Sequence, residues 1–133
     1  MNSGDDWRYR KGTSAPQTGW QTIPDASLDA TWLTGAGGFG YGDGDDATEL
    51  LDMAGGSGYR TVYIRREFTV EPGDLIAADK VILDIDYDDA YVAYLDGVEV
   101  ARSSISPGSS GKLGRTSIST TAASSMSMCK WSI

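Results

Sequence analysis

One stretch of the sequence, VILDIDYD at residues 81–88, follows a two-residue period. Its odd-numbered positions are all apolar, and three of its four even-numbered positions are aspartates. A period of two alternates side chains between the faces of a strand, whereas a helix repeats about every 3.6 residues. The stretch therefore predicts a β-strand with one buried face and one acidic face.

A hairpin is predicted directly after this strand. The dipeptide Asp96-Gly97 separates the apolar stretches AYVAYL and VEVAR. Asp-Gly is a strong signal for a type I′ turn, since both central residues of that turn need positive φ. The segment Tyr59–Val70 also alternates over several residues and predicts a further strand.

Two segments nearer the start are less regular. The run GAGGFGYGDGDDAT, Gly35–Thr48, is too rich in glycine for a regular element, so we expect a long ordered loop there. The run DASLDATW, Asp25–Trp32, predicts a helical turn that Asp25 or Ser27 can cap.

The strand patterns together predict an all-β fold. We count six to eight strands and little helix, which favours an antiparallel β-sandwich. A chain of 133 residues is long enough for one core, and 17 glycines suit a fold with many turns.

The charge balance excludes some classes of partner. The net charge is −8, and an acidic surface repels phosphate backbones, so we expect no nucleic-acid binding. The chain has no histidine and only Cys129, which removes the usual general base and any cysteine metal cluster. The first residues, MNSGDDWRYRKG, show no signal-peptide pattern, and no apolar run reaches membrane-spanning length.

Four aspartates, Asp84, Asp86, Asp88 and Asp89, form the densest acidic run. Alternate carboxylates on one strand face tolerate water or a cation but not burial. The run lacks the glycine and glutamate that an EF-hand loop requires at its sixth and twelfth positions. A solvent-facing row is the favoured interpretation, calcium binding is second, and catalysis is third.

A second acidic group, Asp43, Asp45, Asp46 and Glu49, lies among glycines. Carboxylates mixed with accessible carbonyls are what hard cations such as Ca²⁺ prefer. Aspartates that cap tight turns through the backbone give the same pattern, and that alternative is the more common one.

The aromatic residues allow a sugar-binding hypothesis. Flat rings stack on the apolar face of a pyranose, although core packing accounts for most aromatic residues in a small domain. Tyr41, within a loop, and Trp20, beside a turn-rich segment, are expected to be the more accessible. No G-x-S-x-G motif is present, and no histidine can activate a serine or Cys129, so we expect no enzyme.

Three quoted motifs carry a family resemblance. They are WRYRKGTSAPQTGWQTIPDASLDATWLTGAGGFGYGDGDDAT, YIRREFTV and DYDDAYVAYLDGVEVAR, which together span residues 7–102. In order and spacing they resemble a galactose-binding-domain-like jelly-roll accessory module of large secreted bacterial proteins. The resemblance implies a non-catalytic, extracellular β-sandwich that binds a glycan or polysaccharide, and a structural calcium ion in a loop.

The resemblance ends near Gly108, which divides the chain into 1–108 and 109–133. The second part holds no acid and three bases and is rich in serine and threonine. Either GRTSISTT and MSMCKWSI supply substitute closing strands, or this part is a flexible tail. An unfinished sheet would expose an edge, so we expect a tendency to form a homodimer through that edge.

The sequence-based hypothesis is therefore a carbohydrate-binding module. We expect Trp20, Tyr41, Arg65 and Asp89 to contact the ligand, and Asp43, Asp45, Asp46 and Glu49 to hold calcium. The alternative is a structural or protein–protein interaction module of a larger extracellular assembly.

Overall fold

The computed structural model describes residues 4–42, 44–56, 58–69, 81–85, 87, 90–103, 114–118 and 125–131, and they are almost entirely strands and loops. The largest element is a six-stranded sheet in which every neighbouring pair is antiparallel. In spatial order its strands are β2 (Leu33–Ala36), β1 (Asp6–Lys11), β5 (Thr61–Glu67), β10 (Ser125–Trp131), β7 (Ala90–Leu95) and β8 (Val98–Arg102).

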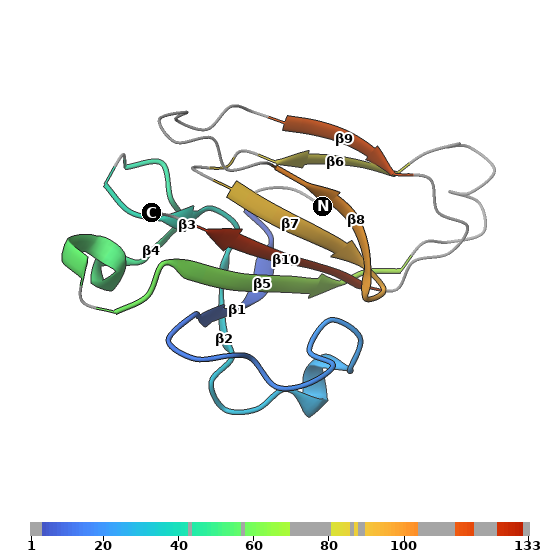
Figure 1. Ribbon diagram of the computed structural model, residues 1–133, viewed down its shortest axis with the longest axis horizontal. Coiled ribbons are helices and arrows are strands. Elements are labelled where there is room, and N and C mark those ends of the chain that lie inside the picture. The colour runs from blue at the N-terminus through green and yellow to red at the C-terminus, as the bar shows by residue number, and fades with distance from the viewer. Residues whose placement is uncertain are drawn as a thin grey trace.

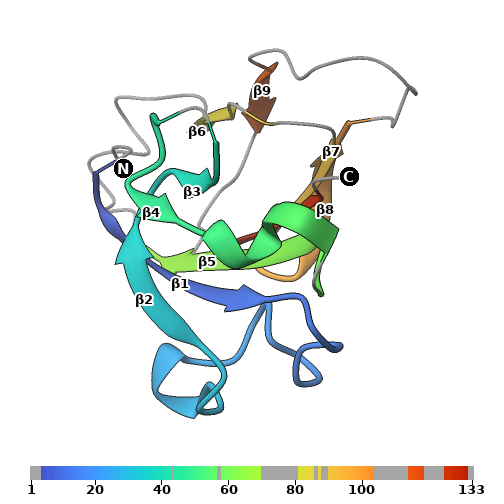
Figure 2. The same ribbon diagram turned by 90° about the vertical axis from the view of Figure 1, so that its left-hand side faces the viewer.

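Two small sheets lie on one side of this large sheet (Figures 1 and 2). One pairs β3 (Phe39–Gly40) with β4 (Thr48–Glu49) in parallel, and the other pairs β6 (Val81–Ile85) with β9 (Gly114–Ile118) in antiparallel. Figure 2 shows the blue chain before β2 on the opposite side of the sheet. Two short 3₁₀-helices, η1 (Asp25–Ser27) and η2 (Leu51–Gly56), complete the regular structure of the residues described.

The hydrophobic core lies between the large sheet and the elements on its first side. It brings together buried side chains from β3, η2, β5, β6 and β7 and from the residues just before η2 and β5, namely Phe39, Leu50, Met53, Tyr59, Val62, Ile64, Ile85, Tyr91, Ala93 and Leu95. Removing such surfaces from water supplies about 25 cal/mol per Å² of apolar area. We call this the core face of the sheet and the opposite side its outer face.

The predicted hairpin is confirmed. β7 and β8 are joined at Asp96 and Gly97, whose φ angles are 48° and 78°. Positive φ at both positions is the type I′ turn that the Asp-Gly pair predicts. The strand in Tyr59–Val70 is also present, as β5, with Val62 and Ile64 buried in the core.

The expected strand at 81–88 is present over its first five residues, as β6. Ile85 is buried, and Tyr87 packs against the same core, as the period of two requires for these two positions. The predicted solvent-facing row falls largely on Asp86, Asp88 and Asp89, which lie outside the described residues. That interpretation stays a prediction.

The expectation of an irregular loop over Gly35–Thr48 was only partly correct. β2 ends inside this stretch, β3 lies within it, and β4 begins at its last residue. A methyl group added at Gly35 would lie 2.5 Å from Thr48 Oγ1, so glycine here permits close packing of β2 and β4. Glycine at position 35 therefore makes room for the side chains of Thr48 and Tyr9 against the β2 backbone rather than forming a turn.

The predicted helical turn in Asp25–Trp32 is η1, but its capping was predicted wrongly. The residue before it is Pro24, and no side chain of the turn caps its first amides. The amide of Asp25 donates instead to Glu67 Oε1 of β5, over 3.0 Å. A carboxylate distant in sequence thus takes the role expected of Asp25 or Ser27.

The segment after Gly108 contributes two strands, β9 and β10. These are the two stretches named above as possible substitute strands. β10 lies between β5 and β7 in the large sheet, with Met128 opposite Ile64 on one side and Ala93 on the other. The outermost strands of the sheet are β2 and β8.

Candidate functional site

The outer face of the sheet is covered in part by residues 12–32, which we call the outer loop. Arg8 and Arg10 of β1 flank Tyr9, which packs on the core, so both arginines belong to the outer face. In the sheet register Arg8 lies opposite Arg65 and Arg10 lies opposite Tyr63. Three guanidinium groups therefore lie beneath the outer loop.

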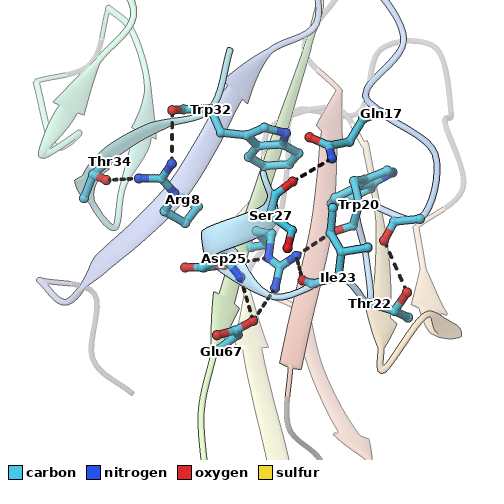
Figure 3. Close-up of polar contacts among 12 residues, drawn as sticks. Arg8, Gln17, Trp20, Thr22, Ile23, Asp25, Ser27, Trp32, Thr34 and Glu67 are labelled. Carbon is cyan, nitrogen blue, oxygen red and sulfur yellow. Dashed lines mark hydrogen bonds and ion pairs between the residues drawn. The ribbon is translucent and has the colours of Figure 1, made fainter. Parts of the chain in front are cut away.

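Arg65 fixes the middle of the outer loop. It is fully buried, and its Nη1 donates to the carbonyl oxygens of Trp20 at 2.7 Å and Ile23 at 2.6 Å. Two carboxylates compensate its charge, with Nε 3.1 Å from Asp25 Oδ1 and Nη2 3.0 Å from Glu67 Oε1. The same oxygen of Glu67 also accepts from the amide of Asp25, and Figure 3 shows these two residues side by side. A buried charge needs such pairing, because desolvation is otherwise very unfavourable.

The carboxyl of Asp25 reflects the same environment. Its pKa is raised above its ordinary value because partial burial penalises the charged form by more than Arg65 favours it. Asp25 therefore lies at the boundary between the buried arginine and solvent.

Arg10 and Arg8 fix the two ends of the loop. Arg10 donates to the carbonyl oxygen of Ser14 at 2.5 Å and to Thr31 Oγ1 at 2.8 Å. Thr31 in turn donates to Asp29, and these hydrogen bonds lower the pKa of the Asp29 carboxyl. Arg8 donates to Thr34 Oγ1 at 2.7 Å and to the carbonyl oxygen of Trp32 at 3.2 Å (Figure 3).

The outer loop carries two tryptophans into an aromatic cluster. Trp20 stacks on Trp32 with ring centroids 5.5 Å apart, and it forms T-shaped pairs with Tyr63 and Tyr94, whose ring centroids lie 5.4 Å and 6.4 Å from its own. Both indoles are buried, but Tyr63 of β5 and Tyr94 of β7 are only half-buried. Two tyrosine rings on the outer face are thus oriented by a buried tryptophan.

A β-bulge in β8 adds a charged pair to the same face. Ala93 lies opposite Ala101, but Tyr94 lies opposite Glu99, so Val100 is an extra residue in the ladder. Glu99 and Arg102 form a bidentate ion pair, with Arg102 Nε and Nη2 at 2.5 Å and 2.6 Å from its oxygens. The hydrogen bonds from Arg102 lower the pKa of the Glu99 carboxyl.

The structure places the four predicted ligand contacts in different surroundings. The expectation that Trp20 is accessible was wrong, since its side chain is 6 % exposed beneath Trp32. Arg65 is fully buried and bonded to the outer loop, which leaves its guanidinium out of reach of a ligand. Tyr41 is half-buried against the core, on the other side of the sheet, and Asp89 lies outside the described residues.

The predicted calcium ligands are not gathered into a cluster in the part that the structure describes. Asp45 and Glu49 are exposed, Asp46 is half-buried against Gly40, and Asp43 lies outside the described residues. Among the described residues no three of His, Cys, Asp and Glu form a group that could hold a metal ion. Calcium binding at this loop stays a prediction.

A separate polar cluster joins η2 to the end of β1. Tyr59 donates to Asp52 Oδ1 at 2.7 Å, and Lys11 Nζ lies 2.6 Å from Asp52 Oδ2. The hydrogen bonds from Lys11 and Tyr59 lower the pKa of Asp52, while burial and the hydrogen bond to Asp52 raise the pKa of Tyr59. Tyr59 is buried, Lys11 is half-buried and Asp52 is exposed, so the cluster runs from the core to the surface.

No family model, curated protein or solved structure matches this chain. The functional argument therefore rests on the residues described above. Within the described parts of the chain, no helix is long and apolar enough to cross a membrane.

Sequence reasoning missed the residues that form the accessible part of the outer face, namely Tyr63, Tyr94, Glu99 and Arg102. Alternation along β5 and β7 could have assigned the two tyrosines to one face. Glu99 and Arg102 are three positions apart and would lie on opposite faces of a regular strand. Only the bulge brings them together, and nothing in the sequence marks it.

Proposed function

We propose that this protein is a non-catalytic carbohydrate-binding module with the galactose-binding-like jelly-roll topology that its motifs resemble. The observation that supports it most is the outer-face arrangement of Tyr63 and Tyr94, two half-buried rings that both contact the buried Trp20. Aromatic rings with a polar neighbourhood are the groups that stack on pyranose rings.

Pre-organisation favours binding at this surface. The outer loop is fixed by Arg8, Arg10 and Arg65, so Trp20 holds its position before any ligand arrives. A ligand that meets rings already in place does not have to order them, which leaves more of the contact energy for binding. The ligand residues of this proposal are therefore Tyr63 and Tyr94, with Trp20 and Arg65 acting as their support.

An extracellular location and a structural calcium ion in the Asp43–Glu49 loop are proposed on the resemblance alone. The calcium site would use Asp43, Asp45, Asp46 and Glu49 together with glycine carbonyls, since hard cations prefer oxygen ligands. Neither proposal bears on whether the outer face binds sugar.

The alternative is a structural or interaction module that associates through the edges of its sheet. It is favoured by two exposed apolar side chains on the outermost strands, Leu33 of β2 and Val98 of β8. Under this alternative the chain forms a homodimer whose fraction rises with concentration and falls in a Val98→Lys variant. Light scattering over a wide concentration range distinguishes the two, because sugar binding requires no dimer.

The direct test is a glycan array followed by calorimetry on the sugars that bind. We expect Tyr94→Ala to weaken binding at least tenfold and Tyr94→Phe, which keeps the ring, to bind nearly as tightly as the parent. Arg60→Gln, at an exposed position before β5, is the control that leaves affinity unchanged. Absence of binding to every sugar at millimolar concentration would reject the proposal.

A further inference from the structure

The bulge in β8 determines which side chains stand next to Tyr94. Residues directly opposite each other in an antiparallel pair share a face, so Glu99 shares the face of Tyr94 and Arg102 shares that of Val92. Tyr94 and Val92 are two positions apart on β7 and both belong to the outer face. The bulge therefore puts Glu99 and Arg102 together on the outer face beside the Tyr94 ring.

The pair keeps unused hydrogen-bonding capacity toward solvent. A guanidinium has five N–H donors, and Arg102 uses Nε and Nη2 to hold Glu99. The side chains remain 64 % exposed at Arg102 and 36 % exposed at Glu99. Donors and carboxylate lone pairs are thus both presented at the surface, within one rigid planar pair.

The hairpin that carries this pair is held against the outer loop. A methyl group added at Gly97 would lie 2.6 Å from Thr22 Cγ2, so the β7–β8 turn packs closely on the loop. That contact places the turn beside the outer loop that carries Trp20, and Trp20 also forms a T-shaped pair with Tyr94. The hairpin backbone that carries Tyr94, Glu99 and Arg102 is therefore packed against the outer loop.

We infer that Tyr94, Glu99 and Arg102 form a subsite for a neutral pyranose with two adjacent hydroxyl groups. The inference rests on the proposed carbohydrate-binding function and names the sugar class that its surface selects. The apolar face of the sugar stacks on Tyr94, one hydroxyl donates to the Glu99 carboxylate, and its neighbour accepts from Arg102. A hydroxyl both donates and accepts, so adjacent hydroxyls match a surface that presents both kinds of group.

Charge explains why the subsite selects neutral sugars. The positive charge of Arg102 is already compensated by Glu99, and the whole chain carries a net charge of −8. The carboxylate of a uronic acid would have to displace Glu99 from Arg102 or remain beside it as a second negative charge. Discrimination by an unfavourable like charge is a general route to specificity.

The test compares matched pairs of sugars that differ only in oxidation at C6. Methyl glucoside, galactoside and mannoside are titrated calorimetrically into the protein beside the corresponding methyl uronates. At least one neutral member is expected to bind, with its uronate at least tenfold weaker. Glu99→Gln and Arg102→Gln should each weaken the neutral sugar at least fivefold, while Arg60→Gln, at the other end of the sheet, should not.

Uronate affinity in the Glu99→Gln variant is the most informative measurement, since this variant removes the negative charge that pairs with Arg102 and lets Arg102 bind the uronate carboxylate. We expect this variant to bind the uronate more tightly than the parent does, which a general loss of structure cannot produce. Uronate binding equal to or tighter than neutral binding in the parent, or variants at Glu99 and Arg102 without effect, would overturn the inference. If no sugar binds, or if Tyr94→Ala binds as tightly as the parent, the proposed carbohydrate-binding function is rejected, and not only the subsite.

Discussion

The buried guanidinium of Arg65 donates a hydrogen bond of 2.7 Å to the main-chain carbonyl of Trp20, across 45 positions of the sequence. This bond, with the one to Ile23, attaches the outer loop to the centre of the large sheet. Trp20 in turn contacts Tyr63 and Tyr94. The proposed binding surface therefore depends on Arg65, although Arg65 itself is buried and does not contact the ligand.

Replacing Arg65 by methionine should destabilise the fold strongly. The change leaves the carbonyl oxygens of Trp20 and Ile23 without their donor, and each buried polar group left unpaired costs about 1–3 kcal/mol. It also removes the cation that pairs with the partly exposed carboxylates of Asp25 and Glu67. Urea unfolding followed by tryptophan fluorescence measures the loss. The matched variant Arg60→Met, at an exposed position, should change the free energy of unfolding by less than about 0.5 kcal/mol. Equal effects of the two variants would show that Arg65 does not hold the loop.

Gly97→Ala should destabilise the β7–β8 hairpin for two separable reasons. Alanine at a φ of 78° is strained by about 1–3 kcal/mol, and its methyl group would also meet Thr22 Cγ2. Gly44→Ala is the control for strain alone, since Gly44 has a φ of 82° and nothing within 4 Å. Thr22→Ser, which removes Cγ2, should recover part of the loss in the Gly97→Ala variant and none in Gly44→Ala. Thermal melts of Gly97→Ala and Gly44→Ala, each with and without Thr22→Ser, separate the backbone strain from the clash with Thr22.

The Asp52 cluster should make stability depend on acid pH. The pKa of the Asp52 carboxyl in the folded chain lies below its ordinary value of 3.8. The ionised carboxylate therefore contributes its full stabilisation of the fold above pH 3.8, and this contribution is lost as the pH falls through the lowered pKa. Asp52→Asn should therefore be less stable than the parent at pH 7, and the difference should shrink below pH 4. Tyr59→Phe, which removes one donor to Asp52, should show a smaller effect of the same sign. A difference that is constant from pH 7 to pH 3 would contradict this role for Asp52.

Calcium should raise the melting temperature if the Asp43–Glu49 loop binds it. A ligand that binds only the folded state stabilises it by about 2.7 kcal/mol when present at 100 times its dissociation constant. Melts with calcium, with magnesium and with a chelator measure this, and Asp45→Asn should reduce the calcium effect. Identical melts in all three conditions would mean that the loop is simply solvated.

Some elements of the fold could be predicted from the sequence and others could not. The strand at Val81–Ile85 and the turn at Asp96-Gly97 follow from local rules, because alternation and turn chemistry act over a few residues. The burial of Trp20 and Arg65 was not predictable in this way. It arises from hydrogen bonds between segments more than 40 positions apart, which leave no periodic signal.

The candidate site was the least predictable feature. Its tyrosines lie on β5 and β7, which are separated in the sheet by β10, so their proximity depends on the order of strands in space. The pairing of Glu99 with Arg102 depends on one extra residue in β8. Both are properties of topology and register, and they follow only once the strands are assembled.

The most direct measurement is a two-dimensional amide NMR titration of the isotope-labelled protein with the tightest-binding neutral sugar from the array. The outer-face proposal predicts concentration-dependent shifts concentrated at Tyr63, Tyr94, Glu99 and Arg102. Shifts confined to the loop from Tyr41 to Glu49, on the core side of the sheet, would contradict it.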